Sequence, residues 1–334
     1  MIEENNRIEN VDSIFHQRID IGMLNNGMID IRNEIGKVIV GQNKMIDLLL
    51  IGLLSDGHIL IEGVPGVAKT LTAKLLAKII DTGFSRIQFT PDLMPGDVLG
   101  TSVFNPGEGK FDFKRGPIFS NIILIDEINR APAKTQSALF EVMEEKQITI
   151  DGHTYPMDFP FMVLATQNPI EQEGTYRLPE AQLDRFLFKI IVDYPTVDDE
   201  VNILMNQQSV TPNTLLNNVQ KIFTTHQILE YRNIINEVII EPQLIRFIAE
   251  IVNATRNNPS LFLGASPRAS LAILKASKAS AAIKGRDFVT PEDIIEMALP
   301  VMRHRIILTP EKEMEGISAD ELVMNIINNI EVPR

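Results

Sequence analysis

The chain has 334 residues, 44% of them hydrophobic and 22% charged, which is typical of a soluble globular protein with more than one domain. The absence of cysteine excludes disulfides and cysteine-ligated zinc, and five scattered histidines disfavour a histidine-rich metal site. The formal net charge of −13 disfavours nucleic acid as a partner, and no apolar run approaches the ~20 residues that cross a bilayer.

Residues 1–22 form a polar, acidic lead-in that is unlike a secretory signal, so we expect a cytoplasmic protein without a membrane span. Helical patterns run from about Met23 to Leu54, and residues 58–63 (HILIEG) predict a strand buried on both faces. A glycine-rich loop and then a helix follow directly. Further buried strands are expected at NIILIDE, FMVLATQN and FLFKIIVDYP, with helical segments between them. This alternation predicts a parallel sheet flanked by helices, an α/β core over residues 23–196.

Two stretches interrupt the alternation of strands and helices in this core. FNPGEGKFDFKRGPI is glycine-rich with alternating residues, and QITIDGHTYPMDF carries an Asp-Gly turn between two alternating arms. Both predict β-hairpins inserted into the α/β core.

The pattern changes after Pro195, where strand signals nearly vanish and amphipathic helices dominate. Two of these helices have recognisable starts, with Ser266 or Thr290 as the cap and proline at the first helical position. We expect a separate helical domain over residues 197–334.

The loop Gly63–Thr70, GVPGVAKT, nearly matches the phosphate-binding pattern G-x-x-x-x-G-K-[ST]. In such a loop Lys69 would neutralise the β- and γ-phosphates, and Thr70 would offer its hydroxyl to Mg²⁺. Ala68 replaces the last glycine, which costs ~1–2 kcal/mol if the backbone there is left-handed, and close to nothing otherwise. The alternative interpretation is a tight turn in some other α/β protein.

A second motif, ILIDE, places Asp126 and Glu127 at the end of a buried strand. Ligands of open α/β sheets bind at the carboxyl ends of the strands, where the glycine-rich loop also lies. Asp126 could hold the Mg²⁺ shell, and Glu127 could polarise a water for attack on the γ-phosphate. A solvated strand end is the alternative, but the two motifs together favour ATP and Mg²⁺ as cofactors.

With both motifs present, residues 20–330 resemble the MoxR family of AAA+ ATPases, in the branch with an insert in helix 2. The resemblance rests on Val40-Gly41-Gln42 and on the motifs GVPGVAKT, QFTPDLMPGD, GPIFSNIILIDEINRAPAKTQSALFEVMEE, ATQNPIEQEGTYRLPEAQLDRF and GASPRAS. An alanine before the lysine is familiar in this family. The implied fold is a parallel-sheet P-loop AAA+ core with inserted hairpins, followed by a small all-helical lid domain.

The resemblance implies roles for individual residues. Those implied to bind the nucleotide are Gly41, Gln42, Gly63, Val64, Pro65, Gly66, Val67, Ala68, Lys69, Thr70, Leu71 and Asp126, with Thr70 and Asp126 also at the metal. Those implied to be catalytic are Glu127, Asn168 as sensor 1, Arg185 as an arginine finger and Arg268 as sensor 2. Arg130 and Arg177 are weaker candidates for a subunit interface.

Each of the last three catalytic assignments has a plainer alternative. Asn168 could be a turn-forming residue before Pro169, and Arg268 a simple surface charge. Arg185 could be a helix-end arginine paired with Asp184 or Glu180.

The resemblance implies an ATPase that works in a homo-oligomeric, hexameric ring and remodels partner proteins, including proteins with a von Willebrand A domain. In such a ring the hairpins would face the pore or one face. A DNA-directed motor of the same branch is the alternative, which the net charge of −13 disfavours. The first hairpin also mixes basic with acidic residues. A nucleotide switch that does not hydrolyse ATP is disfavoured because Glu127 and Asn168 are both present.

Overall fold

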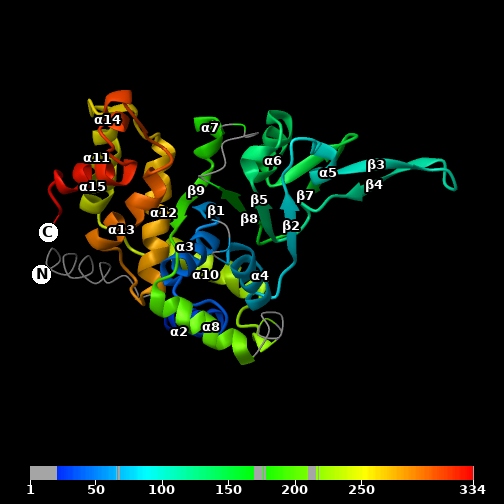
Figure 1. Ribbon diagram of the computed structural model, residues 1–334, viewed down its shortest axis with the longest axis horizontal. Helices are drawn as coiled ribbons and strands as arrows, with labels where there is room; N and C mark the ends of the chain where they lie inside the picture. Colours follow the sequence, from blue (N-terminus) through cyan, green and yellow to red (C-terminus); the bar gives the residue numbers. More distant parts are fainter. Residues whose placement is uncertain are drawn as a thin grey trace, which may run out of the picture.

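The computed structural model describes residues 21–64, 66, 68–168, 176, 178–209, 216 and 218–333. Its centre is a sheet of five strands in the order β2-β5-β8-β1-β9 (Figure 1). The strands are β1 (His58–Gly63), β2 (Phe84–Gln88), β5 (Ile122–Asp126), β8 (Met162–Gln167) and β9 (Phe186–Val192). All neighbouring pairs are parallel, as the alternation of strands and helices predicted.

Helices cover both faces of the sheet, which explains why its central strands are apolar runs. Along β5, Ile122 and Leu124 join one hydrophobic core, while Ile123 and Ile125 join the other. The first core contains α2 (Gly22–Gly36), α3 (Asn43–Leu54) and α4 (Lys69–Ile79). The second contains α5 (Pro95–Leu99), the short helix η2 (Ile128–Arg130) and α6 (Ala133–Glu145).

Strand β2 is absent from the sequence prediction. Its sequence FSRIQ is mostly polar, and only Ile87 is buried. It lies at one edge of the sheet, where a single neighbouring strand, β5, covers it. Strand β2 has no continuous apolar run like those that revealed the other four strands.

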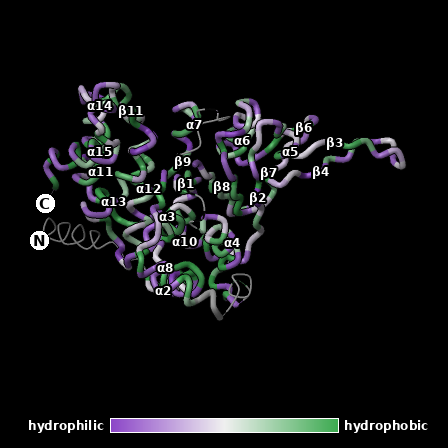
Figure 2. Tube along the Cα trace, viewed as in Figure 1, coloured by the Kyte–Doolittle hydropathy of each residue, from purple (hydrophilic) through white to green (hydrophobic). Residues whose placement is uncertain are grey.

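Both predicted hairpins are present and antiparallel. The first, β3 (Gly100–Asn105) and β4 (Lys110–Arg115), projects far from the rest of the molecule (Figure 1). It carries hydrophobic as well as hydrophilic residues along its length (Figure 2). The second, β6 (Gln147–Ile150) and β7 (His153–Pro156), turns at Asp151 and Gly152, whose φ angles of 50° and 78° suit a tight hairpin.

Helix α7 (Glu180–Leu183) precedes β9 in the chain, and the elements after β9 form the predicted helical part. Most of this part lies on the β9 side of the sheet, away from the first hairpin (Figure 1). Its helices are α8 (Val197–Ser209), α10 (Thr225–Glu237), α11 (Pro242–Arg256), α12 (Pro267–Ile283), α13 (Pro291–Met302), α14 (Pro310–Met314) and α15 (Ala319–Asn328). It also contains two short paired strands, β10 (Leu261–Leu263) and β11 (Ile307–Leu308).

The predicted helix starts are confirmed at two positions in this part. The Ser266 hydroxyl accepts the backbone N–H of Arg268, and Thr290 forms a capping box with Asp293. Pro267 and Pro291 occupy the first helical positions.

The division at residues 196 and 197 stays a proposal. Helices α10 and α12 pack against α3, and their apolar side chains belong to the same core as those of α3. The helical part is therefore firmly seated on the α/β core. Within the described ranges, no helix has the length and apolar character needed to cross a membrane.

Candidate active site

The glycine-rich loop connects β1 to α4 at the carboxyl edge of the sheet. Gly63 ends β1, and a Cβ there would lie 2.8 Å from the carbonyl oxygen of Val192, so the neighbouring strand leaves room only for glycine. Gly66 has φ +91° and no atom near the position a Cβ would take. Lys69 begins α4 and donates to the carbonyl oxygen of Gly63 at 2.6 Å, which closes the loop.

Ala68 has the left-handed conformation that costs energy for alanine, with φ 58° and ψ 17°. This decides between the two backbone conformations left open by the sequence, and the cost is ~1–2 kcal/mol. The Ala68 carbonyl oxygen accepts the Thr72 backbone N–H at 2.9 Å and the Thr72 hydroxyl at 3.0 Å. These bonds hold the strained residue at the start of α4, where the free backbone N–H groups of a helix favour phosphate.

The side chains of Val64, Ala68 and Leu71 pack against the main hydrophobic core, so they support the loop from behind. Thr70, in the first turn of α4, is half-buried. Pro65 and Val67, which were also expected at the nucleotide, lie outside the described residues.

The two acids end the central strand β5 as expected. Asp126 is its last residue and is buried, and its carboxylate accepts the Thr166 hydroxyl at 3.2 Å. Glu127 follows in a left-handed conformation, with φ 58°, and its backbone N–H donates to the same hydroxyl at 3.1 Å. Thr166 of β8 therefore fixes both acids.

Electrostatics connects these acids to the loop. Burial lowers the pKa of Lys69, while the charges of Asp126 and Glu127 act in the opposite direction. Lys69 thus lies within electrostatic reach of both carboxylates. The loop and the acids form one site at the carboxyl edge of the sheet.

Strand β2 contributes two residues to this site that the sequence analysis missed. Arg86 Nε donates to Asp126 Oδ2 at 2.6 Å, and Gln88 Nε2 donates to Glu127 Oε2 at 2.9 Å. They are two apart on one strand and therefore share a face. The alternation of polar and apolar residues from Arg86 to Phe89 (RIQF) was the signal that could have revealed them. Arg130, expected only at an interface, also contacts Glu127, at 3.1 Å.

The residues proposed for Mg²⁺ suit that ion chemically. Thr70 and Asp126 offer hydroxyl and carboxylate oxygens, the hard donors that Mg²⁺ prefers. Mg²⁺ commonly binds through one or two protein oxygens, with phosphate oxygens and waters completing its shell. Among the described residues there is no cluster of three or more His, Asp or Glu that would hold a metal by itself. The donor set therefore fits a metal that arrives with a phosphate ligand.

Gly41 and Gln42 line a cavity of about 470 Å³ beside the start of the loop. A Cβ on Gly41, whose φ is +78°, would lie 2.5 Å from the Asp199 side chain, and Gln42 Nε2 donates to the Asp193 carbonyl oxygen at 3.4 Å. Residues that the sequence analysis missed complete the wall, among them Tyr194, Arg303 and Asp320. They come from three distant segments, so no local pattern marks them.

Asn168 follows β8, which pairs with β5, so it lies at the same edge of the sheet as Asp126. It is half-buried. This position agrees with a role near the acids. Arg177 lies outside the described residues.

Arg185 lies at the opposite edge of the sheet. It directly precedes β9, and Phe186 pairs with His58, the first residue of β1. The six residues of β1 separate this edge from the loop by about 16 Å, at ~3.3 Å per residue. Arg185 therefore cannot reach the loop of its own chain.

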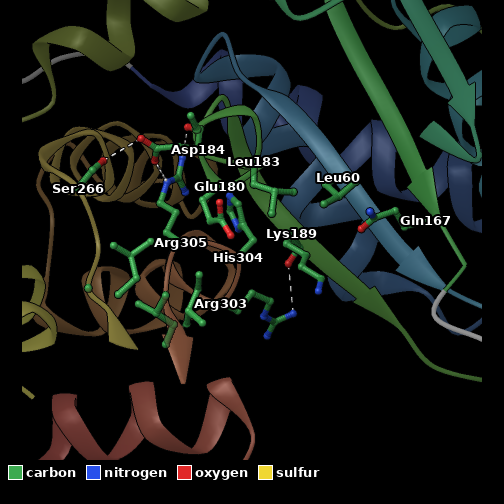
Figure 3. A pocket seen from close by; sticks show the side chains of 15 residues that line it. Leu60, Gln167, Glu180, Leu183, Asp184, Lys189, Ser266, Arg303, His304 and Arg305 are labelled. Atoms are coloured by element: carbon green, nitrogen blue, oxygen red, sulfur yellow. Dashed lines mark hydrogen bonds and ion pairs between the residues drawn. The ribbon is translucent and has the colours of Figure 1, made fainter. Parts of the chain in front are cut away.

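The contacts of Arg185 differ from those that the plainer interpretation named. Its Nη1 donates to the carbonyl oxygen of Phe140 at 2.6 Å and lies 3.7 Å from Glu144 Oε2, both on α6. Asp184 instead accepts from Arg305 at 2.7 Å and from Ser266 at 2.9 Å, as Figure 3 shows.

Arg268, in the first turn of α12, lies beside Arg185. Its Nη2 donates to Glu144 Oε1 at 3.0 Å, so both arginines share one carboxylate. They line a surface cavity of about 330 Å³. The basic residues of its wall are Lys146, Arg185, Arg268, Lys275 and Arg305, and the acidic ones are Asp56, Glu144 and Asp184. The excess of positive charge suits an anion.

Comparison with known proteins gives this arrangement a family. Residues 58–188 match the model of the ATPase family associated with various cellular activities (AAA), and residues 253–326 match the AAA lid domain. The chain is 44% identical to Chaperone MoxR1 of Mycobacterium tuberculosis, covering 90% of this chain and 81% of the relative. It belongs to the MoxR family of AAA+ ATPases.

Two further relatives agree with this membership of the MoxR family. The uncharacterized protein YeaC of Bacillus subtilis is 45% identical, over 90% of this chain and 93% of its own length. A crystal structure of a candidate ATPase from Cytophaga hutchinsonii is 48% identical, with a TM-score of 0.86 over 93% of this chain and 96% of that one. The expected fold, an AAA+ core followed by a helical lid, is thereby confirmed.

The residue ranges of the two family matches contain most of the candidate site residues. The AAA match contains the phosphate loop, both acids and Arg185, and the lid match contains Arg268. Membership of the family implies use of a nucleotide, usually with Mg²⁺. The roles of the individual residues remain proposals.

Proposed function

We propose that this protein hydrolyses ATP to ADP and phosphate, with Mg²⁺, in a cytoplasmic homo-oligomeric ring that remodels partner proteins. One observation carries the proposal. The phosphate loop and two acids lie at one edge of the sheet, while two candidate catalytic arginines lie together at the other. A site divided in this way is complete only when two subunits meet.

Binding of ATP uses residues of one subunit. The cavity beside Gly41 and Gln42 takes the adenine, and the backbone of Gly63–Thr70 wraps the phosphates. Lys69 exchanges its contact with the Gly63 carbonyl for the β- and γ-phosphates. Thr70 and Asp126 would hold Mg²⁺, which neutralises charge that develops on the phosphates.

For hydrolysis, the Glu127 carboxylate accepts a hydrogen bond from the attacking water and so polarises it. Its carboxylate contacts Gln88 and Arg130, so those two side chains set where the carboxylate lies before ATP arrives. Asn168 approaches from the adjacent strand and orients the same water. Asp126 pairs with Arg86, which holds the carboxylate that would bind Mg²⁺ in place.

Arg185 and Arg268 are proposed to serve the nucleotide of the neighbouring subunit. A guanidinium there stabilises charge on the γ-phosphoryl oxygens, an effect worth ~10³–10⁵ in rate for arginine fingers. The positive excess around the pair supports this assignment. A ring of six is the expected closed form.

Proteins are the proposed clients, including those with a von Willebrand A domain. The M. tuberculosis relative is called a chaperone, and the net charge of −13 disfavours a DNA track. The projecting hairpin exposes Phe104 and Phe111, whose rings lie 5.3 Å apart, and Lys110 on it pairs with Glu108. An exposed aromatic pair next to the tip, with the neighbouring lysine paired to a glutamate, suits polypeptide better than a phosphate backbone.

A mixing experiment tests the divided site. Arg185→Ala should bind ATP normally as an isolated subunit yet hydrolyse it poorly, and Lys69→Ala should fail to bind ATP. Mixed rings should regain activity, because the Arg185→Ala subunit keeps its pocket and the Lys69→Ala neighbour keeps its arginine. No recovery in mixtures that demonstrably co-assemble, or a specific activity that stays constant down to monomer concentrations, would refute the proposal.

A further inference from the structure

Glu144 is the common partner of the two arginines. It lies in the last turn of α6, and its two carboxylate oxygens divide between Arg268 at 3.0 Å and Arg185 at 3.7 Å. Arg185 is also anchored one turn earlier, on the carbonyl oxygen of Phe140. The carboxyl end of a helix and a carboxylate both attract positive charge. The end of α6 therefore binds these two guanidinium groups favourably.

The other carboxylates near the two arginines already pair with different residues. Asp184 is taken by Arg305 and Ser266, and Asp56 by Arg232 and Lys146. In the part of the chain that the structure describes, Glu144 is the one carboxylate that forms an ion pair with Arg185 or Arg268. Without it, two guanidinium groups would repel each other across a surface that already carries a positive excess.

We infer that Glu144 is a positioning residue that holds Arg185 and Arg268 together, at the spacing needed to meet the γ-phosphate of the neighbouring subunit. The inference rests on the proposed function, in which the two arginines contact the γ-phosphate of the neighbouring subunit. Glu144 lies beside the two arginines, at the edge of the sheet opposite the phosphate loop of its own subunit. It acts only through the two arginines.

If Glu144 served only to stabilise the fold, its substitution would change stability rather than kcat. The side chains of Glu144 and Arg268 are 41% and 50% exposed, and exposed ion pairs of this kind contribute little to stability. Glu144→Gln keeps the size of the side chain and removes the charge, so the variant should fold and assemble. A misplacement of ~1 Å in catalytic groups can cost about 10² in rate, and we expect a loss of kcat of that order.

The first test compares Glu144→Gln with Glu145→Gln, which removes the same charge from the next residue, also exposed. Steady-state kinetics should show kcat reduced about 10²-fold for Glu144→Gln, with the KM for ATP and the ATP affinity of the isolated subunit unchanged. Glu145→Gln should behave as the wild type. Sedimentation of both variants establishes that they assemble.

A mixing test shows whether Glu144 acts across the subunit boundary. A Glu144→Gln subunit beside a Lys69→Ala subunit receives an intact arginine pair, so activity should recover. In an Arg268→Ala background, Glu144→Gln should cost clearly less than in the wild type, because the shared contact is already gone.

The possible results separate the two proposals. If Arg185→Ala and Arg268→Ala lose activity while Glu144→Gln stays within twofold of wild type, the positioning role is refuted and the proposed function stands. Loss in Glu144→Gln that does not recover on mixing also refutes the role. Full activity in both arginine variants would remove the proposed function and the positioning role together.

Discussion

Replacing Ala68 by glycine tests whether the strained loop is already in its binding conformation. At φ 58° and ψ 17° alanine loses ~1–2 kcal/mol relative to a residue without a Cβ. Glycine regains this in the folded state but gives back about 0.4–1 kcal/mol through the greater freedom of the unfolded chain. The free energy of unfolding should therefore rise by between zero and about 1.6 kcal/mol. Thr72 holds the Ala68 carbonyl in the ligand-free loop, and we expect the same contact when ATP is bound, which makes the strain equal in the two states. The Kd for ATP should change by less than about threefold, or ~0.7 kcal/mol.

Two measurements check this reasoning on purified Ala68→Gly and wild-type protein. Titration calorimetry with ATP and Mg²⁺ gives the affinity, and urea unfolding gives the stability. Ala68→Val is the matched control, because a β-branched residue at positive φ is strained further and should destabilise the loop. Binding of ATP by Ala68→Gly that is tighter by 30-fold or more would show that the methyl group obstructs the phosphates. A less stable Ala68→Gly would show that the backbone at this position is not left-handed in solution.

Three other predictions concern binding, the lid and the pH dependence of stability. Lys69→Ala should abolish or severely weaken ATP binding while Glu127→Gln binds ATP and loses hydrolysis; unimpaired affinity of the lysine variant, measured by calorimetry, would remove the phosphate-loop assignment. Asp293 is fully buried and accepts two hydrogen bonds of 2.7 Å from Arg286, so Asp293→Asn should lower the free energy of unfolding by ~2–4 kcal/mol in urea titrations. An effect below about 0.5 kcal/mol would mean that this charge is not needed. Burial lowers the pKa of His58 from 6.5 to about 4, so its contribution to stability is full above pH 6.5 and falls by about 3 kcal/mol as the pH drops to 4. His58→Gln should show a weaker loss over that range, and an unchanged pH dependence would contradict the buried neutral imidazole.

The parts of the fold that the sequence predicted are those with a local signature. Four strands are continuous apolar runs because helices cover both faces of the sheet, and the glycine-rich loop and β5 acids lie at strand ends. The left-handed backbone of Ala68 could not be predicted, since both candidate conformations agree with the residues around it. Strand β2 was missed because its exposed side chains include Arg86 and Gln88. Because the strand was missed, these two side chains, which contact the acids of β5, were missed as well.

The assembly of distant residues was also beyond the sequence. The plainer alternative to an arginine finger paired Arg185 with Asp184 or Glu180, its neighbours in the chain, yet its partners lie on α6. The contact depends on how α6, the start of β9 and the start of α12 pack together. Arg303 and Asp320 line the cavity beside Gln42 for the same reason. Residues brought together by packing leave no spacing pattern in the chain.

The placement of loop and arginines at opposite edges of one sheet has a consequence for assembly. If each subunit offers arginines at one end and a pocket at the other, the contact between subunits is head-to-tail and has a direction. An open chain of subunits then always has a terminal pocket that no arginine reaches, and a pair of unused arginines at its other end. A closed ring has neither. Closure of the ring therefore adds one active site to the assembly without altering any contact already made. In an open chain, a subunit with an inactive pocket costs no activity only at the end where no arginine reaches the pocket.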